Sequence, residues 1–243
     1  AAPAPAPVME VEGLTLLTPD RSKVICRDLS FTLHEGQSLL LFAPSGAGKS
    51  SLLRAFAGLW NAGRGRVRRP PDDQVFFVPQ KPYMPVGTLA DQVAYPRGVY
   101  GEGEEEGGEG AAAAEVLSKV QLAHVLARLA GEGGLAATRP WEHELSVGEQ
   151  QRLAAARVLY RRPTLAYLDE STSGLDRANE AALYAALRGD GEGGGGGCRA
   201  HVSIGHRPTL FEFHTHVLTL VNEDEAKWEV MPTKQFIKQH RLI

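Results

Sequence analysis

The sequence has no apolar run that approaches the roughly 18 continuous residues of a membrane-spanning helix. It also has neither an initiator methionine nor a signal peptide at its start, where Ala1 opens a short run of alanine and proline. We therefore expect a soluble piece of a longer protein, with residues 1–7 as a stiff, extended linker or a disordered tail.

Cysteine is scarce, and basic residues are not in excess. Cys26 and Cys198 lie far apart, which fits neither a disulfide framework nor a metal-ligand pattern, so a reducing compartment is favoured. The 26 lysines and arginines are balanced by 29 acidic residues, and the net charge is -3. This balance argues against sequence-independent binding to a nucleic-acid backbone.

The length of 243 residues and the hydrophobic content of 43% allow one good-sized core or two small ones, and we expect one domain with a lobe. Short apolar runs separated by turns over residues 8–42 predict an antiparallel group of strands and then a core strand at Ser38–Phe42. Apolar residues recur at helical spacing over Ser50–Leu59, which places Leu59 on the apolar face of a predicted helix.

Farther along the chain, predicted strands alternate with predicted helices. The strands are expected at Asp73–Pro79, 164–169 and 200–205, and the helices at Ala111–Ala130 and near 178–188. The Glu/Gly stretch at 101–110 and the Gly-rich stretch at 189–197 are predicted to be loops. Strands separated by helices indicate a parallel sheet with crossover connections, and therefore an α/β fold.

A run of small residues from Ala43 to Ser50 joins the predicted core strand to the next helix. In such a turn, successive backbone N–H groups converge on phosphate oxygens, and the helix N-terminus adds a partial positive charge. Lys49 would supply a point charge to the β and γ oxygens, and Ser50 a hydroxyl to Mg²⁺. The residues predicted to bind phosphate are Pro44, Ser45, Gly46, Ala47, Gly48, Lys49, Ser50 and Ser51. The alternative is a Gly/Ser turn without function.

Two adjacent carboxylates, Asp169 and Glu170, end the apolar run that begins at Leu165. The carboxyl end of a buried strand is where ligands gather in open α/β sheets. We expect Asp169 to hold Mg²⁺ through water and Glu170 to orient and polarise an attacking water. Taken alone, the pair is equally well interpreted as acids that merely cap a strand.

Ser146 and Glu149 form the Ser-x-x-Glu pattern of a capping box, ahead of a helix predicted over 150–160. A capped helix N-terminus with Gly148 beside it is also a good anion site. His206 directly follows the predicted strand at 200–205, and we expect it to sense the γ-phosphate. A histidine that only satisfies a loop is the alternative.

Taken in this order, the motifs resemble the nucleotide-binding domain of ATP-binding cassette (ABC) proteins over roughly residues 10–222. The matches are Lys49 and Ser50 to the Walker A lysine and serine, Gln80 to the Q-loop glutamine, Leu145–Arg152 to the LSxGEQQR signature, Asp169 and Glu170 to the Walker B aspartate and catalytic glutamate, 173–176 to the D-loop, and His206 to the switch histidine.

Finer matches resemble the D subfamily of half-transporters, which includes peroxisomal fatty-acyl carriers and related bacterial and plastid proteins. These matches lie at 58–60, 78–96, Trp141 and 203–207. Two features depart from the family pattern. Ala43 stands where the family usually has the first Walker A glycine, a change that is tolerable if its φ stays negative, and Leu14–Arg21 contains no aromatic residue to stack on adenine.

The arginines at 64, 66, 68 and 69 form a cluster typical of a solvated turn, and no role is assigned to them. For the fold, the resemblance implies a P-loop NTPase (RecA-like) core with a mainly parallel sheet, an N-terminal antiparallel β-subdomain and a helical signature subdomain. It places the nucleotide-binding domain at 8–222, the helical subdomain at about 81–160, and a C-terminal tail at 223–243.

For the function, the resemblance implies that ATP and Mg²⁺ bind. The residues that would catalyse hydrolysis are Glu170, His206, Gln80 and Lys49; those that would serve the metal are Ser50, Gln80 and Asp169; and those that would complete the site of a second such domain, identical or different, are Ser146, Gly148 and Asp176.

The segment after Gln80 would contact a transmembrane domain of the same longer polypeptide. The location implied is the soluble face of an organellar membrane, such as that of a peroxisome or plastid, or of a bacterial inner membrane, and no nucleic-acid partner is expected. Two alternatives stay open. One is a soluble ABC ATPase that acts on DNA or ribosomes rather than in transport, and the other is a regulatory module that binds nucleotide without hydrolysing it.

Overall fold

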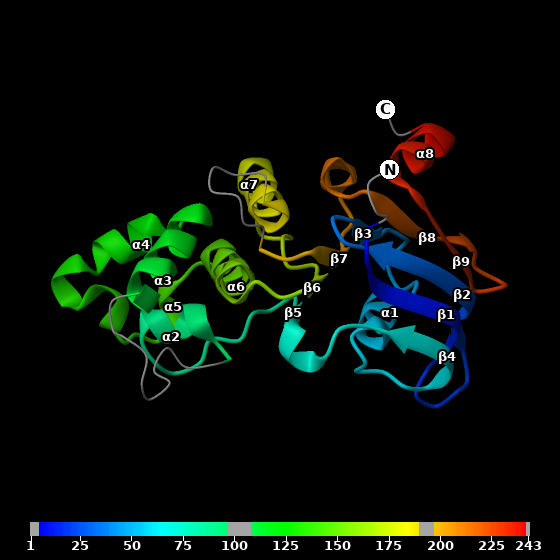
Figure 1. The fold of residues 1–243 in the computed structure, drawn as a ribbon, viewed down its shortest axis with the longest axis horizontal. Helices are drawn as coiled ribbons and strands as arrows, with labels where there is room; N and C mark the ends of the chain where they lie inside the picture. The colour runs from blue at the N-terminus through cyan, green and yellow to red at the C-terminus, as the bar shows by residue number, and fades with distance from the viewer. Residues whose placement is uncertain (1–4, 97–107, 190–196, 242–243) are drawn as a thin grey trace. The chain divides into compact units, whose positions relative to one another are not determined.

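The computed structural model describes residues 5–96, 108–189 and 197–241. They form two units (Figure 1). The described residues of the first unit are 5–77, 163–170 and 199–241, and those of the second are 78–96, 108–162, 171–189 and 197–198. Among the described residues, no helix has the length and apolar character needed to cross a membrane. The loops predicted at 101–107 and 190–196 lie outside the described residues.

The first unit is built on a six-stranded sheet with the order β5-β6-β7-β3-β8-β9. Its strands are β3 (Ser38–Leu41), β5 (Val75–Val78), β6 (Leu165–Asp169), β7 (Ala200–Ile204), β8 (His216–Asn222) and β9 (Lys227–Pro232). β7 and β8 flank β3 in parallel, β6 runs parallel to β7, and β9 is antiparallel to β8. Every residue of β3, β6 and β7 is buried, as expected for the inner strands of a parallel sheet.

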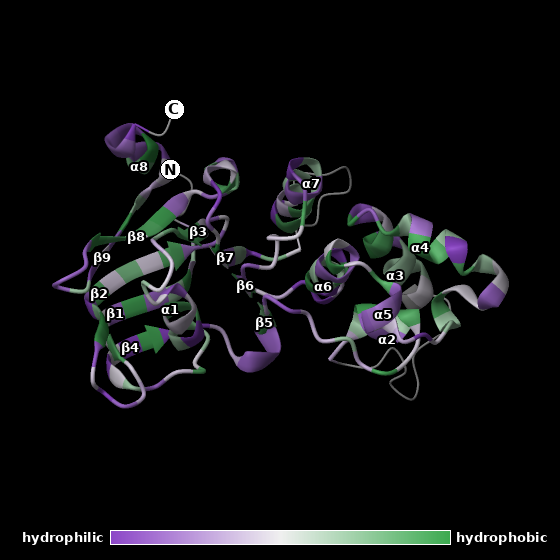
Figure 2. Ribbon diagram, turned by 180° about the vertical axis from the view of Figure 1, so that it is seen from behind, coloured by the Kyte–Doolittle hydropathy of each residue, from purple (hydrophilic) through white to green (hydrophobic). Residues whose placement is uncertain are grey.

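A three-stranded antiparallel sheet with the order β2-β1-β4 completes the strands of this unit. It contains β1 (Pro7–Leu17), β2 (Val24–His34) and β4 (Gly63–Arg68). One hydrophobic cluster joins both sheets to helix α1 (Lys49–Phe56), with Met9, Leu33, Leu41, Phe56 and Tyr167 among its fully buried members. Strands β1 and β2 of the smaller sheet accordingly carry green, hydrophobic residues in Figure 2.

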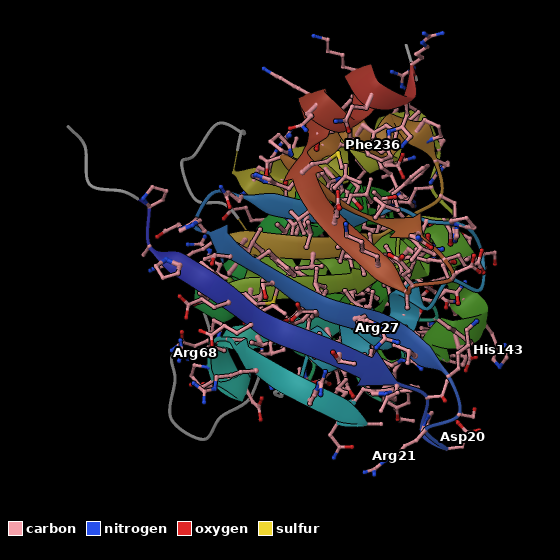
Figure 3. All side chains as sticks on the ribbon, turned by 90° about the vertical axis from the view of Figure 1, so that its right-hand side faces the viewer. Asp20, Arg21, Arg27, Arg68, His143 and Phe236 are labelled. Atoms are coloured by element: carbon pink, nitrogen blue, oxygen red, sulfur yellow. The ribbon has the colours of Figure 1, made fainter. Side chains whose placement is uncertain are left out.

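Strand β4 corrects the interpretation of the arginine cluster as a solvated turn. Arg68 stands opposite Glu10 on β1, and Arg66 stands opposite Glu12. The guanidinium of Arg68, labelled in Figure 3, lies 3.2 Å from Glu10 and 3.0 Å from Glu12. Opposite charges paired across neighbouring strands stabilise a sheet, and they give no apolar alternation by which a strand could be found in the sequence.

The second unit is helical in its described part. Its helices are α2 (Leu89–Ala94), α3 (Gly108–Lys119), α4 (Ala123–Arg128), α5 (Trp141–Glu144), α6 (Val147–Arg161) and α7 (Arg177–Arg188), with short 3₁₀ turns at 130–132 and 134–136. The prediction of a single helix over 111–130 is wrong, because the helix is interrupted between α3 and α4. Gln121 adopts a φ of 59°, and the N–H groups of Gln121 and Leu122 bond back to Ser118 and Leu117, which closes α3 with a Schellman motif.

The helix predicted to reach Leu59 also ends early. α1 stops at Phe56, Gly58 takes a φ of 75°, and the side chain of Leu59 is 68% exposed rather than packed on an apolar face. A glycine in the left-handed region just after a helix commonly ends the helix. Gly58 therefore ends α1, although the spacing of the apolar residues continues to Leu59.

The predicted C-terminal tail contributes β9 and helix α8 (Thr233–His240) to the first unit. Phe236 of α8, labelled in Figure 3, is 2% exposed, and its ring lies 5.3 Å from that of Phe211 and 6.0 Å from that of Phe42. The remaining elements of this unit are two 3₁₀ helices, at Asp72–Gln74 and Pro208–Phe213. The predicted boundaries at 8 and 222 stay a prediction.

Tyr167 of β6 provides a test of the packing between the six-stranded sheet and α1. Its side chain is fully buried, and its hydroxyl donates to the carbonyl oxygen of Phe56 at 2.8 Å. Because Tyr167→Phe leaves that carbonyl without its donor, we expect the free energy of unfolding in urea to fall by about 1–3 kcal/mol. Tyr83→Phe, at an exposed position, should change it by less than about 0.5 kcal/mol, and an equal effect of both variants would contradict the assignment.

Candidate nucleotide-binding site

The turn between β3 and α1 has a backbone that glycine favours at two positions. Gly46 and Gly48 adopt φ values of 80° and 97°, in the left-handed region. A Cβ on Gly48 would lie 2.4 Å from Cγ2 of Ile25, so the turn also lies too close to β2 for any side chain there. Ala43, which replaces the usual first glycine, does not have a positive φ, and the condition set for its tolerance is met.

The geometry of this turn fits a phosphate group. Gly48 is the N-cap residue of α1 and makes no side-chain cap, so no side chain of its own competes for the first N–H groups of the helix. A Cβ on Gly46 would meet no atom within 4 Å, which means that the backbone there is open to a ligand. A helix N-terminus with accessible N–H groups and a partial positive charge is a ready anion site.

Lys49 lies within the same turn and is 6% exposed. Its Nζ donates to the carbonyl oxygens of Ala43 at 2.8 Å and of Pro44 at 2.9 Å. Burial lowers the pKa of Lys49, and the charge of Glu170 acts in the opposite direction. A buried ammonium that donates to carbonyl oxygens of its own turn is well placed to exchange these contacts for phosphate oxygens.

Ser50 and Asp169 meet at the carboxyl end of β6, where the hydroxyl of Ser50 donates to Oδ1 of Asp169 at 3.2 Å. Burial raises the pKa of Asp169, while the hydrogen bond from Ser50 lowers it. A hydroxyl beside a carboxylate suits the oxygen ligands that Mg²⁺ prefers. In the part of the chain that the structure describes, no group of three or more His, Cys, Asp or Glu side chains could hold a metal ion.

Glu170 and His206 form a second pair at the same edge of the sheet. Oε1 of Glu170 lies 2.8 Å from Nε2 of His206. Glu170 has a φ of 48°, a left-handed conformation that a non-glycine residue rarely adopts and that no residue pattern predicts here. The chain reaches His206 through Gly205, where a Cβ would collide with Leu210.

Four of the predicted site residues belong to the second unit: Gln80, Ser146, Gly148 and Asp176. The predicted capping box is present, since the Ser146 hydroxyl accepts from the N–H of Glu149 and Oε2 of Glu149 accepts from the N–H of Ser146 at 2.8 Å. Asp176 is the N-cap of α7 and accepts from the N–H of Asn179 at 2.8 Å. Gln80 is exposed and follows β5 by two residues.

A link between the signature and the D-loop was missed in the sequence. Gln151, 2% exposed on α6, donates to the hydroxyl of Ser173 at 3.3 Å and accepts from the N–H of Gly174 at 2.9 Å. A Cβ on Gly148 would lie 3.3 Å from the carbonyl oxygen of Gly174. The two adjacent glutamines at 150 and 151, on an otherwise mostly apolar helical face, are the signal that could have found this contact.

A glycine turn on a helix N-terminus, with an acid pair at the end of a parallel strand of the same sheet, defines the class of P-loop nucleotide-binding proteins. A profile described as ABC transporter matches residues 26–173. An uncharacterized ABC transporter ATP-binding protein from Synechocystis sp. is 42% identical over 91% of this chain and 31% of its own length. ABC transporter D family member 2, chloroplastic, from Arabidopsis thaliana is 37% identical over 91% of this chain and 36% of its own length.

ATP-binding cassette sub-family D member 3 from Homo sapiens is 37% identical over 87% of this chain and 30% of its own length. The chain therefore belongs to the ABC transporter family, and it is an ATP-binding domain homologous to members of the D subfamily. It spans about a third of the length of these relatives.

Among solved structures, a bacterial Atm1-family ABC exporter with ATP bound superposes with a TM-score of 0.76, at 24% identity, over 98% of this chain and 42% of that chain. At this identity the likeness concerns the fold. It confirms the expected P-loop NTPase fold, with its mainly parallel sheet, antiparallel β-sheet and helices.

The capping box predicts a pH dependence. Burial would raise the pKa of Glu149, but hydrogen bonds from His124 and Ser146 outweigh it and lower the pKa to about 2 from an ordinary value of 4.5. A carboxyl whose pKa is lowered by folding stabilises the protein above its unfolded pKa, and this contribution is lost as the pH falls. We expect the difference in unfolding free energy between the parent chain and Glu149→Gln to shrink as the pH falls from 4.5 toward 2.

Urea unfolding at a series of pH values from 7 to 3 measures this difference. Glu144→Gln is the matched control, because Glu144 is an exposed carboxyl close to the same helix start. Parent and Glu149→Gln profiles that stay parallel across this range would show that the capping carboxylate contributes nothing to the acid sensitivity.

Proposed function

We propose that the chain binds ATP with Mg²⁺ on the turn from Ala43 to Ser51 and hydrolyses it. The observation that carries the proposal is the pair of Glu170 and His206, 2.8 Å apart, at the same sheet edge as the phosphate-binding turn. The described side chains at this edge supply the parts that phosphoryl transfer needs, which are an anion cradle, a cation, oxygen ligands for a metal and a proton acceptor.

Each residue has a distinct role in this proposal. Lys49 would release the carbonyl oxygens of Ala43 and Pro44 and neutralise phosphate oxygens. Ser50, Asp169 and Gln80 would serve Mg²⁺, which supplies charge neutralisation at the phosphates. The carboxylate of Glu170 would orient the attacking water and accept its proton, while His206 would hold that carboxylate in place and sense the γ-phosphate.

The proposal includes a second nucleotide-binding domain, identical or different, arranged head to tail. Ser146, Gly148 and Asp176 would then complete the site formed by Lys49 of the other domain. The support is the solvent-exposed start of α6, where Ser146 is exposed and Val147 is 66% exposed. ATP between the two surfaces would hold the domains together until it is hydrolysed.

We further propose that hydrolysis powers transport by a membrane-bound half-transporter. Two of the relatives of which this chain spans about a third are named as ABC transporters, and one of these two is chloroplastic. The transmembrane domain would lie elsewhere in a longer polypeptide, in a peroxisomal, plastid or bacterial inner membrane. The loop after Gln80 would contact it, since Tyr83 is 61% exposed there and Val86 is 97% exposed.

Replacing the proposed proton acceptor separates binding from turnover. We expect Glu170→Gln to bind ATP with unchanged affinity, because the phosphate-binding turn is untouched, and to lower kcat by roughly 10²–10⁴-fold. Release of inorganic phosphate measures turnover, and equilibrium dialysis measures affinity. Glu223→Gln, an exposed carboxyl in the same unit, should hydrolyse ATP like the parent. Undiminished phosphate release by Glu170→Gln would refute the assigned role.

Removing the buried ammonium tests the cradle itself. We expect Lys49→Ala to raise the Kd for ATP roughly 10- to 100-fold, since hydrogen bonds to charged groups are lost. Lys23→Ala, at a position outside the turn between β3 and α1, is the control that should leave the Kd unchanged. An unaltered Kd for Lys49→Ala would mean that nucleotide binds elsewhere.

A further inference from the structure

A loop at 82–87 connects the segment after Gln80 to α2 without regular secondary structure, yet its backbone is fixed at alternate residues. The carbonyl oxygens of Tyr83, Pro85 and Gly87 each accept a hydrogen bond from a buried or nearly buried side chain. In chain order the donors are Arg157 at 2.8 Å, Gln92 at 2.8 Å and Trp141 at 2.9 Å. We name these three side chains the carbonyl clamp.

Arg157 is the most costly member of the clamp to bury. It is 3% exposed on α6, and its Nε also donates to the carbonyl oxygen of Gln92 at 2.7 Å. Its guanidinium lies 5.0 Å from the centre of the Tyr95 ring and 3.9 Å from the sulfur of Met84. No carboxylate among the described residues forms an ion pair with it, so the loop and α2 supply most of its compensation.

The remaining members are also buried. Gln92 is fully buried on α2, and Trp141 is 2% exposed at the start of α5. A buried donor that loses its acceptor lowers the stability of the folded state. Movement of the loop away from these three side chains is therefore unfavourable, and each of them holds the loop in one position. The side chains of Tyr83 and Val86, in contrast, point to solvent and form an exposed apolar surface.

The clamp leads from this loop to the signature helix. Arg157 belongs to α6 itself, and Trp141 opens α5, which ends directly before the signature. Gln150 of α6 donates to the carbonyl oxygens of Glu142 and Leu145 at 2.9 Å, which ties α5 to the beginning of α6. Two routes of buried hydrogen bonds therefore connect the exposed loop with the helix N-terminus at Ser146.

We propose that Arg157 and Trp141 are positioning residues that lock the 82–87 loop to α6, so that the loop and the signature N-terminus move as one body. A displacement of Tyr83 and Val86 by a partner would then be passed to Ser146 without loss. Only this consequence in transport rests on the proposed function. The mechanical link itself depends on the described contacts of the second unit.

Two spin labels test whether the loop and α6 move together. Val86→Cys and Val147→Cys provide exposed attachment sites, on the loop and at the N-terminus of α6, in a chain in which Cys198 is replaced by alanine and the buried Cys26 is retained. Pulsed electron resonance then measures the distribution of the distance between the labels. The measurement is made without nucleotide, so its outcome does not depend on hydrolysis and stands apart from the test of Glu170.

The parent chain should give one narrow distribution. Arg157→Lys keeps the charge but cannot reproduce the fork that serves two diverging carbonyl oxygens, and we expect the width of the distribution to at least double. Trp141→Phe removes one donor and keeps an aromatic ring of smaller size, and we expect a smaller broadening in the same direction. ATP affinity should stay within about twofold of the parent, since the residues at Ala43–Ser51 are untouched.

Matched controls separate the clamp from general loss of structure. Trp228→Phe removes a comparable bond, from Nε1 to the carbonyl oxygen of Ile25 at 2.9 Å, in the first unit, and Arg128→Met removes an exposed arginine from the second. Neither should broaden the distribution. If Arg157→Lys fails to fold, the width of the distance distribution in the conservative variant Trp141→Phe decides whether the proposal holds. A distribution as narrow as that of the parent in the folded variants would overturn the proposal.

Discussion

The close approach of Gly48 to Ile25 is the constraint on which the site depends. This contact places the turn after β3 directly against β2, so the antiparallel sheet packs against the phosphate-binding backbone. With a side chain at 48 the turn would have to move away, and α1 would no longer begin where its N–H groups converge. The antiparallel sheet thus has a role in the site although it contributes none of the proposed catalytic side chains.

The charged forms of Lys49 and Asp169 are destabilised by burial, and a bound ligand of opposite charge would stabilise them. Lys49 is buried on carbonyl oxygens, and burial lowers its pKa, whereas burial raises the pKa of Asp169. Burial therefore disfavours the charged form of both groups. A bound phosphate would offset the first and Mg²⁺ the second, which gives a physical reason for a site built from opposite, separately buried charges.

Much of this arrangement could be predicted from the sequence, because local rules determine it. Glycines at 46 and 48, the capping box of Ser146 and the strand that ends in Asp169 follow from residue type and spacing alone. The conformation of Glu170 could not be predicted, since its left-handed φ is imposed by tertiary packing rather than by propensity. Strand β4 was missed because its outward arginines are matched to acids on β1, a pairing visible only once the strands are adjacent.

The clamp on the 82–87 loop could not be predicted either, because its contacts are visible only once the loop and the helices are adjacent. It raises the question of why polar side chains, rather than apolar ones, are buried beneath this loop. An apolar residue in place of Arg157 would often stabilise a core equally well, since burying an ion pair or a charge is expensive. Apolar contacts, however, are nondirectional and would let the loop slide over α6. The hydrogen bond from Arg157 of α6 to the carbonyl oxygen of Tyr83 fixes the register of the loop on α6, and the bond from Gln92 to the carbonyl oxygen of Pro85 fixes it on α2. A fixed register is what the loop needs if its exposed surface is to transmit a displacement.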